Sequence, residues 1–310
     1  MALRSNKRLI LIADESTYGT DATPAGTDAL LVRNLEITPL QSDVVSRELI
    51  RPYLGNYEQL LANQRVEITF DVELAGSGTE GTAPKWSAAM TSCGMSETIV
   101  ASTSVTYAPV SSSFDSCSIY FNNDGVRHRI TGCRGSFSLN CEVGQIPTIT
   151  FTMMGIYNAP TDTALPTATY TDQADPVVFK QGNTSAFQLF SYAGILQSVN
   201  YDQANAMIYR ELVGGSKEVL ITNRTPSGTA VVEAVALATH DFFTDATSAS
   251  TGNLTFQHGQ TAGNIVTFTA SQVDLGSPTY SDQDGIQMLN LPYVATPTTS
   301  GNDEVSITLT

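Results

Sequence analysis

The sequence predicts an all-β protein made of two tandem β-sandwich or barrel-like domains with one short flanking helix. Three observations support this fold class: short segments that alternate apolar and polar residues, turn residues between those segments, and an internal repeat. The 310 residues exceed the usual size of one hydrophobic core, which favours two domains.

Residues 65–74 show the alternation most clearly. One face of this predicted strand is apolar and carries Val66, Ile68, Phe70, Val72 and Leu74. The other face is polar and carries Arg65, Glu67, Thr69, Asp71 and Glu73. A strand with this pattern belongs to a sheet that has one side against a core and the other side in water.

Further strands are predicted around short turns. Residues 116–121 and 126–130 flank Asn122–Gly125, whose Asp-Gly dipeptide favours a tight hairpin turn. Residues 136–141 and 148–154 have the composition and length of two more strands. Closely spaced strands joined by such turns are typical of antiparallel sheets.

One helix is predicted, from Pro84 to Cys93. It places Trp86, Ala89 and Met90 at helical spacing, and Gly94 follows as a stop signal. We expect this helix to pack on a sheet, with Trp86 in the core. A binding role for this tryptophan is the less favoured interpretation.

Self-comparison of the sequence finds four matches that keep their order. Arg47–Ile50 recurs as Arg210–Val213, and Arg65–Leu74 aligns with Gly228–Leu237 at the same offset of 163 residues. The other two matches pair Thr150–Thr152 with Thr267–Thr269 and Thr169–Gln173 with Thr279–Gln283. The sequence therefore predicts a duplicated domain, with copies at 1–160 and 161–310 and a turn-rich linker at 158–166. The second copy is expected to lack the helix and the Asn-Asp-Gly hairpin.

The composition is poor in charge and acidic. Charged residues make up 15% of the chain, against about 25% in a typical soluble domain, and the net charge is −15. A surface with few long charged side chains suits repeated subunit contacts, although secreted β proteins share it. The acidic balance excludes a basic nucleic-acid footprint. A negative wall would repel DNA and suit a conduit, while the simpler interpretation is that the charge aids solubility.

No membrane segment, metal site or catalytic group is expected. No stretch approaches the roughly 20 apolar residues of a membrane helix, and Leu9–Ala13 is too short for a signal peptide, which indicates synthesis in the cytoplasm. The four cysteines form no Cys-x-x-Cys pair, and the pairing of Cys93, Cys117, Cys133 and Cys141 stays open. No acid–base pair accompanies a nucleophile, so we expect neither an enzyme nor a cofactor.

Segment 38–64 is too long and too apolar for an ordinary hairpin loop of about two to five residues. Its apolar residues include Val44, Val45, Leu49, Ile50, Tyr53, Leu54 and Tyr57. It is either a flap folded over its own sheet or an arm that packs on a neighbouring subunit, and we favour the arm. The N-terminal stretch 1–30, with several Gly, Thr, Asp and Pro residues, is likewise predicted to be an extended arm.

Several segments resemble the major tail tube proteins of long-tailed, non-contractile (siphovirus-like) phages. They are Glu15–Pro24, Asp28–Val32, Arg47–Tyr53, the helix around Trp86, Asn123–Gly125 with Gly132–Cys133, Gly144–Pro147 and Gly155–Tyr157. The resemblance covers most of residues 12–160, and the internal repeat is the guide to 161–310.

The resemblance implies a structural subunit of the virion tail, assembled in the host cytoplasm, and not an enzyme. Members of this family form rings that stack into a tube, and genome DNA passes through the lumen without specific binding. Strands of adjacent subunits join into a continuous inner β-barrel, while loops and terminal arms tie one ring to the next. Segment 38–64 would be the inter-ring arm, and other tail proteins would be partners.

Many family members are single domains that form rings of six. A chain with two copies implies rings of three with pseudo-sixfold symmetry, and a hexamer is the second choice. The candidate lumen residues are Glu67, Asp71 and Glu73, because carboxylates repel DNA. Two other functions stay open. One is a different virion structural protein, such as a tail terminator, baseplate or capsid decoration protein. The other is a carbohydrate-binding β-sandwich module, which predicts an exposed aromatic platform.

Overall fold

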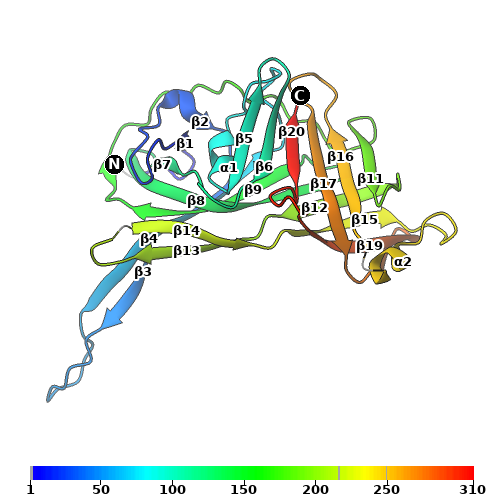
Figure 1. Cartoon of the computed structure of the whole chain (residues 1–310). Helices are drawn as coiled ribbons and strands as arrows, with labels where there is room; N and C mark the ends of the chain where they lie inside the picture. Colours follow the sequence, from blue (N-terminus) through cyan, green and yellow to red (C-terminus); the bar gives the residue numbers. More distant parts are fainter. Residues whose placement is uncertain (1–2, 216, 249) are drawn as a thin grey trace.

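The computed structural model describes residues 3–215, 217–248 and 250–310 and is a β-sandwich, which confirms the all-β prediction. Its lower layer in Figure 1 is an antiparallel sheet that we call the long sheet. Within the described residues, eight strands form it in the order β3 (Arg33–Ser46), β4 (Gln59–Glu73), β9 (Thr148–Tyr157), β8 (Val126–Glu142), β12 (Leu196–Asp202), β15 (Ser227–Glu233), β19 (Ile286–Ala295) and β18 (Thr279–Gln283).

The opposing layer is made of shorter strands (Figure 1). One group is β2 (Ala29–Leu30), β1 (Arg8–Asp14) and β7 (Cys117–Asn123), which joins the first half of β8. The other group runs β5 (Met95–Val100), β6 (Ser104–Pro109), β20 (Ser306–Leu309), β17 (Val266–Leu275), β16 (Gly252–His258) and β11 (Thr184–Leu189). The far end of β17 pairs with β19, so β17 links the two layers.

The remaining elements lie around this sandwich. The helices are η1 (Gly26–Asp28), α1 (Ser87–Thr91) and α2 (Phe242–Thr247), and the two-residue β10 (Thr161–Asp162) pairs with the start of β8. The strands β13 (Asn205–Glu211) and β14 (Lys217–Arg224) form a separate two-stranded sheet. This β13–β14 hairpin lies beneath β8 and β9 in Figure 1.

A row of aromatic side chains fills the space between the layers. Phe70 contacts Phe151 with ring centroids 5.6 Å apart, and Phe151 contacts Phe137 at 6.5 Å. Phe137 in turn contacts Tyr201 at 5.9 Å, and Tyr201 contacts Phe268 at 5.3 Å. The row therefore runs without a break from the first half of the chain into the second, and the two halves share one core.

The local predictions are confirmed in the strands. Residues 65–73 of the predicted strand lie in β4, and the apolar residues from Val66 to Leu74 are all at most 2% exposed. The predicted hairpin around Asn122–Gly125 is the β7–β8 hairpin. The predicted linker 158–166 contains only the short β10.

The prediction of a single helix is wrong. The expected helix exists as α1, shorter than predicted, with Trp86 buried and its Nε1–H donating to the Ala75 carbonyl at 3.0 Å. The unexpected α2 lies in a polar stretch that has no long apolar stripe. Asp241 caps it by accepting hydrogen bonds from the backbone N–H groups of Phe243 and Thr244.

The two halves of the chain repeat one strand order in the long sheet. The first group is β3-β4-β9-β8 and the second is β12-β15-β19-β18, and each runs first, second, fourth, third along the chain. A short helix follows the second strand of each group, so the second half does not lack its helix. The offset of 163 residues is wrong in detail, because it places inward-facing Ile68 on outward-facing Val231.

The prediction of an extended N-terminal arm is wrong for residues 8–30. Leu9, Ile10, Leu11 and Ile12 are buried in β1, which pairs along its whole length with β7. Alternate side chains of this strand enter the main core and a smaller cluster with Tyr120, so both faces are covered. The run Leu9–Ala13 is therefore a central strand of its layer.

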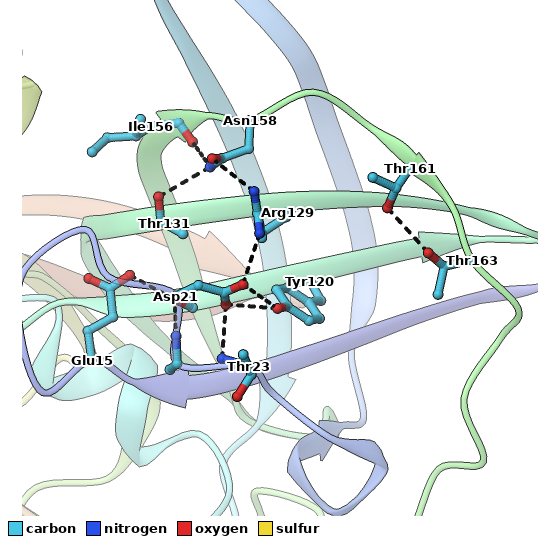
Figure 2. A network of polar contacts seen from close by, with 12 residues as sticks. Glu15, Asp21, Thr23, Tyr120, Arg129, Thr131, Ile156, Asn158, Thr161 and Thr163 are labelled. Atoms are coloured by element: carbon cyan, nitrogen blue, oxygen red, sulfur yellow. Dashed lines mark hydrogen bonds and ion pairs between the residues drawn. The ribbon is translucent and has the colours of Figure 1, made fainter.

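Two carboxylates attach the following turn to the body of the protein (Figure 2). Glu15 accepts hydrogen bonds of 2.7 Å each from Ser116 Oγ, Ser118 Oγ and the Gly132 and Gly19 N–H groups. Asp21 accepts hydrogen bonds from the Tyr120 hydroxyl at 2.6 Å, from Arg129 Nη1 at 3.2 Å and from the Thr23 backbone N–H at 2.9 Å. Polar contacts, rather than apolar ones, thus hold this turn in place.

Asp21 predicts a pH dependence of stability. Burial raises the pKa of Asp21, but the hydrogen bonds from Tyr120, Thr23 and Arg129 outweigh it, so the pKa lies below its ordinary 3.8. A depressed folded pKa stabilises the protein above pH 3.8, and the contribution is lost as the pH falls through the folded value. We expect Asp21→Asn to lower the free energy of unfolding at pH 7, and this difference to shrink near pH 3. Denaturant titrations at both pH values measure it, and an equal difference at both contradicts the assignment.

Candidate functional site

The β3–β4 hairpin extends far beyond the body of the protein (Figure 1). Within the described residues β4 pairs with β9 only from Arg65 onward, so residues 43–62 form a two-stranded ribbon that we call the arm. The predicted loop 38–64 is therefore mostly strand, with a connection at 47–58. The alternative of a flap over its own sheet is wrong, because the arm points away from the sheet.

Apolar side chains of the arm lie in water. Ile50 and Leu54 are fully exposed, Tyr53 is 66% exposed, and Val44, Val45 and Leu49 are about half exposed. An isolated two-stranded ribbon is at best marginally stable, and an exposed apolar group of this size usually marks an interaction surface. Tyr57 differs from the other predicted arm residues because it is partly buried within the tip.

Arg51 organises the tip of the arm. Its guanidinium lies 4.0 Å from the ring centre of Tyr57 and 4.8 Å from that of Tyr53. It also donates to the Asn56 carbonyl at 3.0 Å, and the Tyr57 hydroxyl donates to the Leu49 carbonyl. These contacts give the tip a shape of its own while the apolar side chains of Ile50 and Leu54 stay outside it.

The outward side of the long sheet, which we call the polar face, is acidic and rich in hydroxyl groups. Its carboxylates are Glu36, Glu67, Asp71, Glu73, Glu142, Asp202 and Glu233. Its hydroxyl and amide residues include Thr69, Ser136, Ser138, Asn140, Thr148, Thr150, Thr152, Asn200 and Thr229. Cross-strand pairs such as Asp71 with Thr150 and Asp202 with Ser138 place these residues on one surface.

The three predicted acids lie on this polar face in different settings. Glu67 Oε1 lies 3.4 Å from Arg65 Nε, and Glu73 Oε1 lies 3.7 Å from Arg33 Nη1. Asp71 instead accepts hydrogen bonds from Thr150 Oγ1 at 2.6 Å and from the Asn34 side chain at 2.7 Å. Arg33 and Arg65 lie on β3 and β4, the first two strands of the sheet.

Sequence reasoning missed four of the seven acids on this face, among them Glu36 of β3. Glu142, Asp202 and Glu233 come from three strands that are adjacent only in the folded sheet. The alternation of Ser136–Cys141 with Glu142 as the next outward residue was the available signal. This signal alone does not identify the surface, because the three acids share a face only when β8 pairs with β12 and β12 pairs with β15.

The β13–β14 hairpin covers one end of the polar face. Arg134 on β8 donates to the Val219 carbonyl of β14 at 2.9 Å and to the Phe114 and Asp115 carbonyls. The Tyr18 ring lies 4.6 Å from the Arg134 guanidinium, and the Tyr18 hydroxyl accepts from the Val219 N–H at 2.6 Å. Burial raises the pKa of Tyr18 to about 12, so this hydroxyl stays neutral and also donates to the Gly132 carbonyl.

The four cysteines and the single tryptophan lie in the core. In the part of the chain that the structure describes, no three His, Cys, Asp or Glu side chains gather in a way that could hold a metal ion. The four cysteines are free and buried, and burial raises the pKa of the Cys93 and Cys133 thiols. Trp86 is 3% exposed, so it offers no aromatic platform for a sugar.

The comparison with protein families decides among the remaining structural roles. The family model of the phage tail tube protein matches residues 5–310. The chain belongs to the phage tail tube protein family. This tail tube protein is accordingly a structural component of the virion tail, from a family whose role is structural rather than enzymatic and which assembles with itself and other tail proteins. Among curated proteins, no sequence matches it.

The match extends over both halves of this tail tube protein, whereas the resemblance seen in the sequence was strongest in residues 12–160. No helix in the described ranges is long and apolar enough to cross a membrane. The arm exposes apolar side chains and the polar face exposes carboxylates, so these two surfaces are the candidates for contact with other molecules.

Arg134 is predicted to hold the β13–β14 hairpin against the body of this tail tube protein. Arg134→Ala removes three donated hydrogen bonds and the contact with the Tyr18 ring. We expect amide exchange in residues 205–224 to speed up by roughly ten- to a hundredfold, the equivalent of about 1.4–2.8 kcal/mol. Hydrogen-exchange mass spectrometry measures this, with Arg8→Ala as the matched control because Arg8 makes one long contact to the Leu35 carbonyl. Unchanged exchange in Arg134→Ala contradicts the assignment.

Proposed function

We propose that this tail tube protein assembles into rings that stack into the tail tube of a siphovirus-like phage, and that its polar face lines the lumen through which genome DNA passes. The observation that carries the proposal is the polar face itself. Seven carboxylates and many hydroxyl groups lie on one side of the long sheet, on strands from both halves of the chain.

The negative charge of the polar face suits the wall of a channel through which DNA passes. Duplex DNA carries about one negative charge per 1.7 Å of its length, and proteins bind it by neutralising phosphates and releasing counterions. Glu142, Asp202 and Glu233 add negative charge to this face and cannot neutralise phosphates. Hydroxyl groups keep the wall hydrated, so DNA slides along it without being held.

The arm supports the stacking of rings. It projects beyond the sheet edge, and its fully exposed Ile50 and Leu54 need a partner surface to leave water. Burying one such side chain contributes about 1.5–3 kcal/mol, and each contact repeats around a ring. The arm would therefore dock on a subunit of the adjacent ring.

The ring is proposed to contain three chains with pseudo-sixfold symmetry, and six chains are the second choice. The support for three is the repeated strand order, which gives each chain two similar four-stranded groups at 1–160 and 161–310. Three such chains supply six similar groups. Assembly would take place in the host cytoplasm before the tail joins the rest of the virion.

Electron microscopy of the purified protein tests this function first. We expect long hollow tubes, with threefold symmetry in averaged end views. Sixfold symmetry of whole chains would keep the tube and remove the three-chain ring. A protein that stays monomeric at every concentration would instead favour another part of the virion, such as a terminator or baseplate protein.

Charge reversal tests the polar face as the lumen wall. Particles that carry Glu67→Lys, Asp71→Lys and Glu73→Lys together should eject DNA more slowly, because lysines attract the passing phosphates. Raising the salt concentration should reduce the slowing. The matched control is Glu80→Lys, which reverses a charge in an exposed loop. A normal rate of DNA ejection from assembled variant tails would contradict the assignment of the polar face to the lumen.

Polar substitution tests the arm. Ile50→Ser with Leu54→Ser removes two exposed apolar side chains and leaves the fold of the body intact, because neither contacts it. We expect the variant to form rings or short stacks and few long tubes in electron micrographs. The control is Ile195→Ser, which changes a 66% exposed residue outside the arm. Tubes of normal length from the arm variant would exclude an inter-ring role.

A further inference from the structure

Two of the four buried thiols face each other across the β7–β8 hairpin. Cys117 of β7 and Cys133 of β8 are direct partners in the antiparallel pairing, and both side chains are fully buried. Residues directly opposite each other in antiparallel strands have Cα atoms about 4.5–5.5 Å apart. A disulfide needs Cα atoms about 4.4–6.8 Å apart, so the backbone already has the spacing that a disulfide requires.

The surroundings distinguish this pair from the other two cysteines. Cys93 lies near Cys117 as well, but its sulfur contacts Met153 Sδ at 3.7 Å, and Cys141 lies at the far end of β8. The Cys133 sulfur occupies space that Gly155 of β9 leaves open, because a Cβ atom at this glycine would lie 2.6 Å from it. The two thiols that the strand register aligns are therefore Cys117 and Cys133.

The turn that follows β1 is fastened at the level of this pair. Glu15 accepts hydrogen bonds from the serine hydroxyl groups on either side of Cys117 and from the Gly132 N–H, next to Cys133 (Figure 2). Burial, the neighbouring Cys117 thiol and the Glu15 carboxylate all raise the pKa of the Cys133 thiol. The thiolate is the reactive form of cysteine, so the pair is unreactive while this turn is closed.

We propose that Cys117 and Cys133 form a disulfide after the protein leaves the reducing cytoplasm, and that opening of the Glu15 turn controls this reaction. The oxidant is a small-molecule disulfide such as oxidised glutathione. Disulfides are rare in the cytosol and persist in oxidising surroundings, and a component of the virion tail passes from one to the other. Of the proposed function this needs only assembly in the host cytoplasm, and neither the ring nor the lumen.

The reaction is a thiol–disulfide exchange in two steps. The thiolate of one cysteine attacks a sulfur of oxidised glutathione, the S–S bond of glutathione breaks, and one glutathione leaves as a thiolate. The thiolate of the second cysteine then attacks the protein sulfur of this mixed disulfide and releases the second glutathione. The two cysteines thereby lose two electrons and two protons, and one oxidised glutathione becomes two reduced ones.

The bond closes a loop that contains the Asn122–Gly125 turn and fixes the two strands that anchor Glu15. A disulfide across a loop of this size stabilises a protein mainly by restricting the unfolded chain. We expect the oxidised protein to melt about 5 °C higher than the reduced protein. Calorimetry measures this shift, and Cys117→Ala, which lacks the pair, should melt at the same temperature under both conditions.

Peptide mapping of the purified protein tests the disulfide. The protein is incubated with oxidised glutathione, the remaining thiols are blocked with iodoacetamide in denaturant, and trypsin then cleaves after lysine and arginine. Cys117 falls in the peptide 86–127 and Cys133 in the peptide 130–134. We expect mass spectrometry to find these two peptides joined, and to find them separate after reduction. Because the first peptide also contains Cys93, the same link is expected in Cys93→Ala.

The rate of oxidation tests the control by the turn. Glu15→Gln should form the linked peptide roughly tenfold faster, because it loosens the turn and removes the negative charge near Cys133. Low urea concentrations, which favour local opening, should also speed the reaction in the unmodified protein. The matched control Glu80→Gln changes a carboxylate in an exposed loop and should react at the unmodified rate.

Two outcomes would overturn the proposal. A linked peptide that disappears in Cys93→Ala, or no linked peptide even in urea, would show that Cys117 and Cys133 do not form the bond. Equal rates in Glu15→Gln and the unmodified protein, with no acceleration in urea, would remove the turn as the controlling element. All of these measurements use the unassembled chain, so they are independent of whether tubes form.

Discussion

The alternation of side chains along the long sheet is the constraint on which the rest of this tail tube protein depends. Its strands send alternate side chains inward, and this inward set builds the row from Phe70 to Tyr201, which meets Phe268 of the opposing layer. The same alternation sends the carboxylates and hydroxyl groups of the polar face outward, and a shift of one residue would exchange the two sets. A single periodicity thus specifies the core and the acidic surface together.

The two long hairpins differ in how they solve the same physical problem. A two-stranded ribbon has too little buried surface to be stable alone. The β13–β14 hairpin finds support on its own chain, through Arg134 and through Asn205, whose side chain donates to the Cys93 and Gly135 carbonyls. In the described residues, the arm is held at its base by Asp43, which accepts from the Asn63 side chain at 2.6 Å and lies 3.7 Å from Arg65, and in its tip by the contacts of Arg51. These contacts leave the side chains of Ile50 and Leu54 in water.

The sequence allowed the local features to be predicted, and the non-local ones required the fold. The apolar–polar alternation of β4 and the turn at Asn122–Gly125 each depend on consecutive residues, and the structure confirms both. The acids Glu142, Asp202 and Glu233 come to lie on one face of a sheet only when strands far apart in sequence pair. Helix α2 was missed because its main signal is the cap at Asp241, and the segment 8–30 was misjudged because its turn is anchored by Glu15 and Asp21 rather than by apolar residues.

The position of β20 has a consequence for the order of folding. This strand, Ser306–Leu309, fills the gap between β6 and β17 and is the part of the opposing layer that joins the two halves. Ribosomes add about 5–20 residues per second, and domains generally fold as units while synthesis continues. Here the opposing layer stays open until residues near 309 have left the ribosome. Contacts between residues near 106 and 308 also close a very long loop, which makes folding slow. The edge of β6 therefore stays unfilled until β20 has been synthesised, so this layer closes late in folding.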